Sequence, residues 1–436
     1  MNQISLTQSL IYQLDDKPPF FKNLIYGIQW TVVFIPIIII NASIASKAIG
    51  LDELSQVYFF QRFLLVAGLA TFLQTLVGHQ YPIPEGPATA LLLSFVTLAP
   101  FGLQAIEGGM IVGGFFLFLL GLFKWVKWIT PFFTDRVVGV ILMLIAFTLL
   151  PFLTNLTAGI QPSRPSGDIT VFMISLSLVF LICLFSQWLP GYLKTISMFL
   201  GVLIGFFFFL FLGKINFVPL EKSPWFIFPT DFIVGPPRFA LPCIITFLFA
   251  YLAVIVNSIG SIYGISEIVG KDQIEKRVDR GIAFTGIGGM LAGLTGSIGT
   301  VSYSIGPGVV LVSRVGTRFA LTLCGAILIL LSFVPKLGAL FAIIPSAVIG
   351  AALCVAMGSQ VGAGIAVISK RGEPMKTRDY LIVGVPILLG TITSFLPKGI
   401  YATLPNFLSA ILANGIVFGI IMVLIMEHLL LRERKF

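Results

Sequence analysis

Long apolar segments, each close to the thickness of a membrane, constrain the fold of this chain more than any other feature. A helix needs about 20 apolar residues to cross the hydrocarbon core of a bilayer. Charged residues make up only 10% of the chain, against about 25% in soluble domains, so the sequence predicts an all-α polytopic membrane protein. The long apolar segments are 24–47, 57–77, 106–124, 136–153, 170–190, 195–213, 239–262, 281–298, 317–334, 339–360, 377–396 and 408–431.

Two further apolar segments, 86–99 and 304–313, are too short to cross as ordinary helices, and each opens with Gly-Pro. "EGPATALLLS" (85–94) aligns with "IGPGVVLVSR" (305–314), and each segment is the third of seven spans. Seven is odd, so the second half would insert with inverted topology. Paired short segments interrupted by Gly and Pro indicate a transporter's binding site. The sequence therefore predicts fourteen transmembrane segments as a 7+7 inverted repeat with broken segments 3 and 10.

The positive charge of the chain is distributed as in membrane proteins, although its net value of +9 could also suit nucleic acid. With a cytoplasmic N-terminal tail (1–23), 19 of the 27 Lys and Arg residues fall in cytoplasmic loops. Such a bias sets membrane orientation, and no basic stripe with interleaved aromatic residues is evident. We expect both termini in the cytoplasm, the lipid bilayer as a partner, and no nucleic acid.

The residues required for metal binding, ATP hydrolysis or nucleophilic catalysis are not evident in the sequence. The four cysteines stand alone in apolar runs and only two histidines occur, so no metal or other cofactor is expected. No Walker motif or nucleophile–base set is evident, which argues against ATP hydrolysis and against a membrane-embedded enzyme. The Gly-rich run "GIGGMLAGLTGSIG" (286–299) and the pair Gly260 and Gly264 are interpreted as sites of close helix packing.

Polar residues inside apolar spans are the candidates for function. Glu85 opens the first short segment, where it either serves a ligand or a proton, or only caps loop backbone. Gln29 offers an amide to the edge of a planar heterocycle. Trp30 either stacks on such a ring or belongs to an interfacial belt. His79 is interpreted as a loop histidine.

The second half of the chain holds matching candidates. Asn257 lies in an apolar span and needs a polar partner there. Tyr303 and Ser304 precede the second Gly-Pro, where unpaired backbone N–H groups are expected around Gly306. The predicted substrate site consists of Gln29, Trp30, Glu85, Gly86, Pro87, Asn257, Tyr303, Ser304, Gly306 and Pro307.

The segment from about 250 to 318 resembles the nucleobase–cation symporter-2 family, the nucleobase–ascorbate transporters. The resemblance is carried by "SIG" after Asn257, "RG" at 280–281, "GIGGMLAGLTG" (286–296), and a short span that ends in Ser-Arg. Over 20–430 it follows the order of spans, and "EGP" is similar to a subgroup of purine permeases.

The resemblance implies a core domain of spans 1–4 and 8–11 (24–124 and 237–334) and a gate domain of spans 5–7 and 12–14 (125–236 and 335–436). It implies a homodimer in the cytoplasmic membrane that takes up a nucleobase such as xanthine, urate or uracil. Coupling to H⁺ is implied, and Na⁺ stays open. The alternative is an anion transporter or exchanger of the related fold.

The chain departs from the family pattern at its acids. Asn257 stands where the family has an acid, and Ile305 and Gly306 stand where it has an acid or amide pair. Glu85 is therefore predicted to take over the lost carboxylate role, binding substrate and coupling transport to protons.

Overall fold

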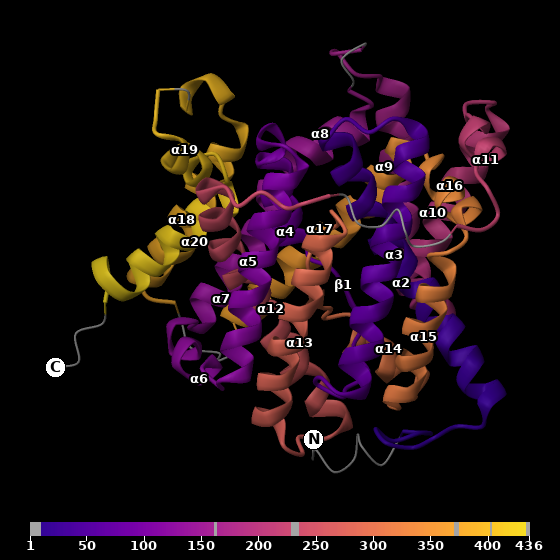
Figure 1. Ribbon diagram of the computed structural model, residues 1–436, viewed down its shortest axis with the longest axis horizontal. Coiled ribbons are helices and arrows are strands. Elements are labelled where there is room, and N and C mark those ends of the chain that lie inside the picture. Colours follow the sequence, from indigo (N-terminus) through magenta and orange to yellow (C-terminus); the bar gives the residue numbers. More distant parts are fainter. Residues whose placement is uncertain (1–9, 161–163, 228–234, 370–374, 402, 433–436) are drawn as a thin grey trace.

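The computed structural model describes residues 10–160, 164–227, 235–369, 375–401 and 403–432, and most of them are helical (Figure 1). Four cations predicted in cytoplasmic loops, Lys370, Arg371, Arg434 and Lys435, lie outside these residues. The first half contains α2 (Phe20–Ala48), α3 (Glu53–Leu76), β1 (Glu85–Pro87), α4 (Thr89–Thr97), α5 (Leu103–Leu122), α6 (Val126–Ile129), α7 (Asp135–Thr148), α8 (Leu150–Ala158), α9 (Ile169–Trp188) and α10 (Ser197–Phe211). The first half ends with α11 (Val218–Lys222). The second contains α12 (Leu241–Val269), α13 (Ile274–Leu294), β2 (Thr300–Ser302), α14 (Gly306–Ser313), α15 (Arg318–Leu331), α16 (Pro335–Ala342), α17 (Ser346–Ile368), α18 (Thr377–Phe395), α19 (Asn406–Leu412), α20 (Gly415–Ile425) and a π-helical turn, Met426–Leu430.

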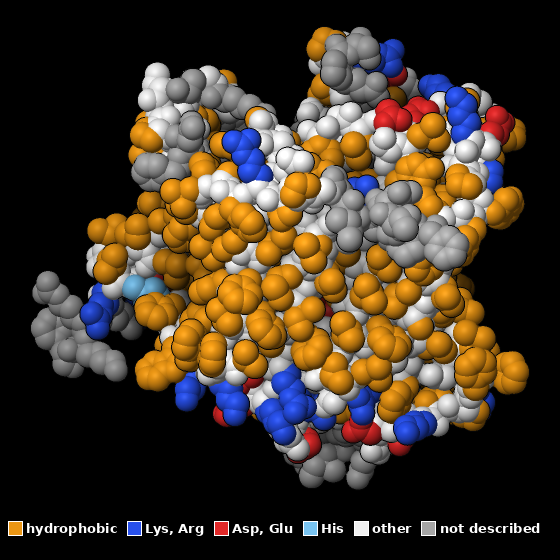
Figure 2. All heavy atoms as spheres, in the orientation of Figure 1, with side chains coloured by type: hydrophobic (Ala, Val, Ile, Leu, Met, Phe, Trp, Pro, Cys, Tyr) orange, Lys and Arg blue, Asp and Glu red, His pale blue; other side chains and the backbone are white. Residues whose placement is uncertain are grey.

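The helices confirm a multi-pass membrane protein. Among the described residues, eight helices are long and apolar enough to span a bilayer, or nine if α15 and α16 count as one bent span. Figure 2 shows hydrophobic side chains across the middle of one face, with Lys and Arg gathered along the lower edge of this view. The total of fourteen spans stays a prediction.

Both predicted broken segments are strands followed by half-helices. β1 leads into α4 and β2 leads towards α14, and the strands pair antiparallel with Glu85 opposite Ser302. The pairing continues beyond them, because Ala88 N donates to the Gly299 carbonyl (2.8 Å) and Tyr303 N to the Pro84 carbonyl (3.0 Å). Extended backbone within a membrane needs such internal partners.

The predicted span 339–360 is wrong at its start. α16 ends at Ala342 and continues α15 across a bend of 91°, and α17 begins only at Ser346. Pro345 lies at the break; it has no N–H for a helical hydrogen bond and is found at helix starts rather than interiors.

Elements of the two halves pack against one another. α3 packs against α15, α5 against α13, and α7 against α17. α18 packs against α7 and α20, on the side of the molecule away from α3 and α15 (Figure 1). This interleaving is what two inverted halves would give, and it carries both strands to the middle of the protein.

The glycines of the run 286–299 allow close helix packing, as predicted. A Cβ on Gly286 would lie 2.3 Å from Phe118 N, and one on Gly293 would lie 2.5 Å from Ile111 Cγ1. The same prediction is wrong for Gly260 and Gly264. A Cβ on Gly260 would meet nothing within 4 Å, and one on Gly264 would meet only Pro307, at 3.6 Å.

We expect Gly286→Ala to lower stability by about 1–3 kcal/mol, since overpacking forces backbone to move. Gly260→Ala is the matched control, because the same methyl group enters open space. Thermal unfolding of the purified protein in detergent measures both. Equal melting temperatures for the two variants would contradict the packing argument.

Candidate functional site

A cavity of about 280 Å³, here called the central cavity, lies where α4 begins and β2 ends. None of the described residues that line it is charged. Its polar side chains come from both halves of the chain. They are Thr89, Asn257, Tyr303, Ser304, Ser359 and Gln360; the apolar lining is Ile37, Ala88, Ala90, Ile145, Met198, Ala253, Val254, Val301, Ile305, Ala356, Met357 and Ala363.

The two half-helices start at this cavity. Thr89 is the first residue of α4, and Ile305 immediately precedes α14. The N-terminal end of a helix carries a partial positive charge and free N–H groups. This wall of the cavity therefore suits electronegative atoms, such as ring carbonyl oxygens.

Serine hydroxyls connect the cavity to the strands. Ser304 Oγ donates to Asn257 Oδ1 (3.2 Å) and lies 2.8 Å from Ser261 Oγ. Ser261 Oγ also donates to the Ser302 carbonyl (2.8 Å). The predicted polar partner of Asn257 is therefore Ser304, at the end of a hydroxyl chain.

Tyr303 covers the strand pair from the cavity side. Its hydroxyl donates to the Pro87 carbonyl (2.6 Å), and its ring meets Phe34 edge to face, with centroids 5.3 Å apart. A Cβ on Gly86 would lie 2.5 Å from the Phe34 ring. Glycine at 86 thus lets the strand approach α2, and hydrogen bonding fixes the Tyr303 ring in place.

Glu85 is fully buried, and it does not line the central cavity. Its Oε1 accepts hydrogen bonds from Gln74 Nε2 (3.2 Å), Thr285 Oγ1 (3.3 Å) and Ser302 Oγ. Its backbone N–H and carbonyl are both held by the Thr71 hydroxyl, each at 3.0 Å. Successive strand residues face opposite sides, so Val301 lines the cavity while Glu85 and Ser302 face α3 and α13.

The other predicted residues lie farther from the cavity. Trp30 is 2% exposed within the core, and Gln29 is half-buried beside it. Ile37, two turns along α2, reaches the lining instead. Pro307 is half-buried in the first turn of α14. His79 is a buried loop residue whose Nδ1 accepts from Tyr81 N (2.9 Å), which fits the structural interpretation.

Sequence reasoning missed the partners of Glu85 and the far wall of the cavity. Gln74 and Thr285 come from α3 and α13, and Ser359 and Gln360 come from α17. Gln74 and Gln360 carry a usable signal, because an amide inside an apolar span is rarely without a function.

Comparison with known proteins gives a consistent result. Residues 21–399 match the Permease family. The chain is 28% identical to uric acid permease PucJ of Bacillus subtilis (92% of this chain, 91% of that one). It is 27% identical to the xanthine permease of the same organism (92% of each chain). It is 26% identical to uric acid transporter UacT of Escherichia coli (91% and 84%).

Solved structures share the fold. The transmembrane domain of the cyanobacterium bicarbonate transporter BicA superposes with a TM-score of 0.59 at 17% identity, covering 91% of this chain and all of that one. The murine anion transporter Slc26a9 in its inward-facing state gives a TM-score of 0.60 at 12% identity, over 97% and 70%. At this identity the likeness concerns the fold alone, and both neighbours are transporters built as inverted repeats.

We expect Thr71→Val to destabilise the protein by about 1–3 kcal/mol and to lower transport, since it leaves the buried N–H and carbonyl of Glu85 without partners. Thr246→Val is the control, because the buried hydroxyl of Thr246 donates to the Pro242 carbonyl of its own helix (2.8 Å). Melting temperature and uptake measure both variants. Equal losses in the two would contradict the assigned role of Thr71.

Proposed function

The chain belongs to the Permease family, and from this membership we propose that it takes up a purine or pyrimidine nucleobase together with a proton. Relatives named for uric acid and xanthine support a base such as urate, xanthine or uracil. As a permease it is a multi-pass membrane transporter and not an enzyme. The proposal includes the cytoplasmic membrane, a homodimer and both termini in the cytoplasm, with the bias of Lys and Arg supporting that orientation.

The observation that carries the proposal is an uncharged polar cavity between two half-helices. Asn257 and Gln360 bring amides, which both donate and accept, and so suit the mixed edge of a nucleobase. Backbone N–H groups in the first turns of α4 and α14 would serve ring carbonyls, whereas those beside Gly86 are already bonded, Glu85 N to Thr71 and Ala88 N to Gly299. Tyr303 offers a ring face. An anion such as bicarbonate would favour a cationic lining, and the described lining has no Lys or Arg.

In this proposal Gln29 and Trp30 do not contact the base; they stabilise α2 behind the cavity. Glu85 is assigned to proton coupling rather than to direct substrate contact. Among the described residues, Gln74, Thr285 and Ser302 all donate to Oε1. Oε2 and the nearby Thr300 Oγ1 are buried without such a bond, which leaves Oε2 as the oxygen that can carry a proton. A carboxyl group that exchanges a proton supports coupling to H⁺. Thr285 and Ser302 also place hydroxyl oxygens beside it, so Na⁺ is the alternative that the experiment must separate.

The serine chain would link the proton to the substrate. Ser302 is shared by the two ends of this link, because its hydroxyl donates to Glu85 and its backbone carbonyl accepts from Ser261, so a change at Glu85 that shifts Ser302 also shifts the partner of Ser261. Ser261 contacts Ser304, which contacts Asn257 in the cavity. If a proton at one end favours substrate at the other, substrate must favour the proton equally. Transport then follows from the core, with both strands, moving against the gate.

We expect Glu85→Gln to abolish the acceleration of uptake by an inward proton gradient, because the amide cannot exchange a proton. Glu107→Gln is the control: Glu107 is a buried acid of α5 without a hydrogen bond to the Glu85 cluster. Uptake of radiolabelled bases into proteoliposomes, with pH and sodium gradients imposed separately, measures both. Wild-type proton dependence in Glu85→Gln, or uptake driven by sodium alone, would overturn this coupling.

We expect Asn257→Ala and Gln360→Ala each to weaken substrate binding about tenfold, which corresponds to the loss of one good hydrogen bond. Melting temperature should stay close to wild type, since both side chains face the cavity. Asn216→Ala controls for loss of an asparagine, because Asn216 bonds to Glu53 in an exposed loop. Binding titrations that do not separate Asn257→Ala from Asn216→Ala would argue against the central site.

A further inference from the structure

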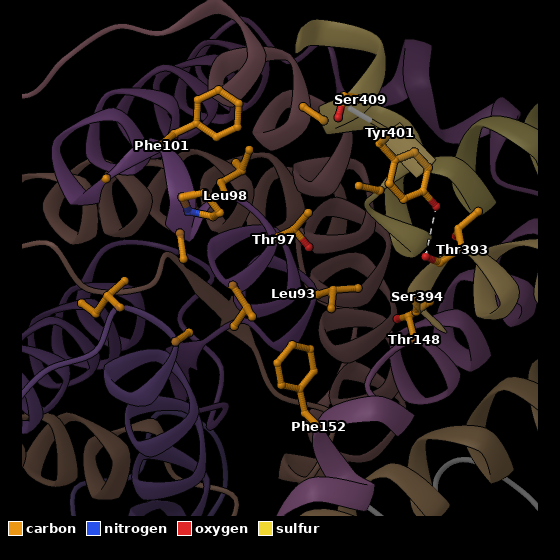
Figure 3. Close-up of a pocket in the computed structure, with 18 of the residues that line it drawn as sticks. Leu93, Thr97, Leu98, Phe101, Thr148, Phe152, Thr393, Ser394, Tyr401 and Ser409 are labelled. Carbon is orange, nitrogen blue, oxygen red and sulfur yellow. Dashed lines mark hydrogen bonds between the residues drawn. The ribbon is translucent and has the colours of Figure 1, made fainter. Parts of the chain in front are cut away.

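A second and larger cavity, here called the outer cavity, lies beyond the central one at the end opposite the N-terminus. Its volume is about 830 Å³. In Figure 3, Leu93, Thr97, Leu98 and Phe101 lie on one side of it, and Tyr401, Thr393 and Ser394 lie on the other. The first group belongs to α4 and the turn after it, and the second to the segment from α18 to α19.

The outer cavity shares uncharged hydroxyls and aromatic rings with the central one, but its described lining has no amide. Its described lining has no charged side chain, and it combines hydroxyls with aromatic rings. Tyr401 donates its hydroxyl to the Thr393 carbonyl (3.2 Å), which fixes the ring against the wall (Figure 3). Thr97 adds a hydroxyl from α4. A small, uncharged, planar molecule with polar edges fits this combination of groups.

Only a thin layer separates the two cavities. On α4, Ala90 lines the central cavity and Leu93 the outer one. On α7, Ile145 lines the central cavity and Thr148 the outer one. Three residues of helix correspond to about 4.5 Å. The linings of the two cavities are therefore about one helical turn apart on both helices.

A buried side-chain hydrogen bond connects α4 to the start of α20 beside the residues that line the two cavities. Asn414 Nδ2 donates to Ser94 Oγ (2.9 Å), and both side chains are fully buried. Asn414 also caps α20, where its Oδ1 accepts from Val417 N (3.2 Å). Ser94 lies beside Leu93 on α4. This bond joins the half-helix of the broken first-half span to the helix that ends the second half, and it must break if the two move apart.

We propose that the outer cavity is a second binding site for the transported base, which is occupied before the central cavity. The Ser94–Asn414 hydrogen bond is the latch that closes the layer between them. The proposal rests on the nucleobase transport proposed above. It adds an order of events: the base binds at the hydroxyl-lined outer site, the latch opens, and the base moves on to Asn257.

The outer site is tested by cysteine labelling. Thr97→Cys is placed in a background in which the accessible Cys183 and Cys354 are replaced by serine, and is labelled with a membrane-impermeant maleimide in sealed vesicles. Xanthine, urate or uracil, whichever the wild type takes up, should protect Thr97→Cys. Protection should need the same concentration when Asn257→Ala is added. A tenfold shift with Asn257→Ala would show that protection reports only the central cavity, and would overturn the outer site.

The latch is tested by labelling a cysteine that lines the central cavity. Ser304→Cys should react at least about tenfold faster when Asn414→Ala is added, because the layer then opens more often. Ser94→Ala removes the same bond and leaves the cap of α20 intact, so it carries the test if Asn414→Ala does not fold. Unchanged labelling in Ser94→Ala would overturn the latch.

The two proposals fail differently. Uptake of a base without protection at Thr97→Cys leaves nucleobase transport standing and removes the outer site. Absence of uptake for every base tested removes both.

Discussion

The pairing of β1 with β2 is the interaction on which the rest of this structure depends. Extended backbone in the middle of a membrane has no water to satisfy it, so each strand is possible only because the other is present. The strands come from opposite halves of the chain, and Glu85 faces Ser302 across them. Their antiparallel register brings the starts of α4 and α14 to one cavity and ties the two halves together at the site.

The alternation of side chains along these strands then divides the site into two parts. Val301 faces the cavity, and Glu85 and Ser302 face the opposite side, towards α3 and α13. Burial of a carboxyl group needs hydrogen-bond donors, and Gln74, Thr285 and Ser302 supply them. The ligand cavity is left without charge, and the acid is kept in a separate polar cluster behind the strands.

The sequence allowed the fold to be predicted better than the site. Runs of apolar residues and the repeated Gly-Pro located the helices and both broken segments, because membrane thickness and proline chemistry act locally. The break at Pro345 was missed although its proline is a local signal for a helix start. The open space at Gly260 was missed because helix packing is set by distant residues. The side on which Glu85 lies depended on strand register, which no local pattern specifies. Gln360 was missed because the face it takes on α17 depends on its neighbours.

In the proposed mechanism, the separation of Glu85 from the cavity bears on the acids that the family has at 257 and 305–306 and that this chain lacks. An acid at 257 would place its charge beside the ligand, so that one group would both bind the base and carry the proton. With Asn257 in the cavity and Glu85 behind the strands, the two tasks belong to different groups. Only hydroxyls and one carbonyl join them, through Ser302, Ser261 and Ser304. The Ser302 carbonyl only accepts, so the link passes through the position of Ser302 itself, whose hydroxyl contacts Glu85 and whose carbonyl contacts Ser261, and no charge has to enter the cavity.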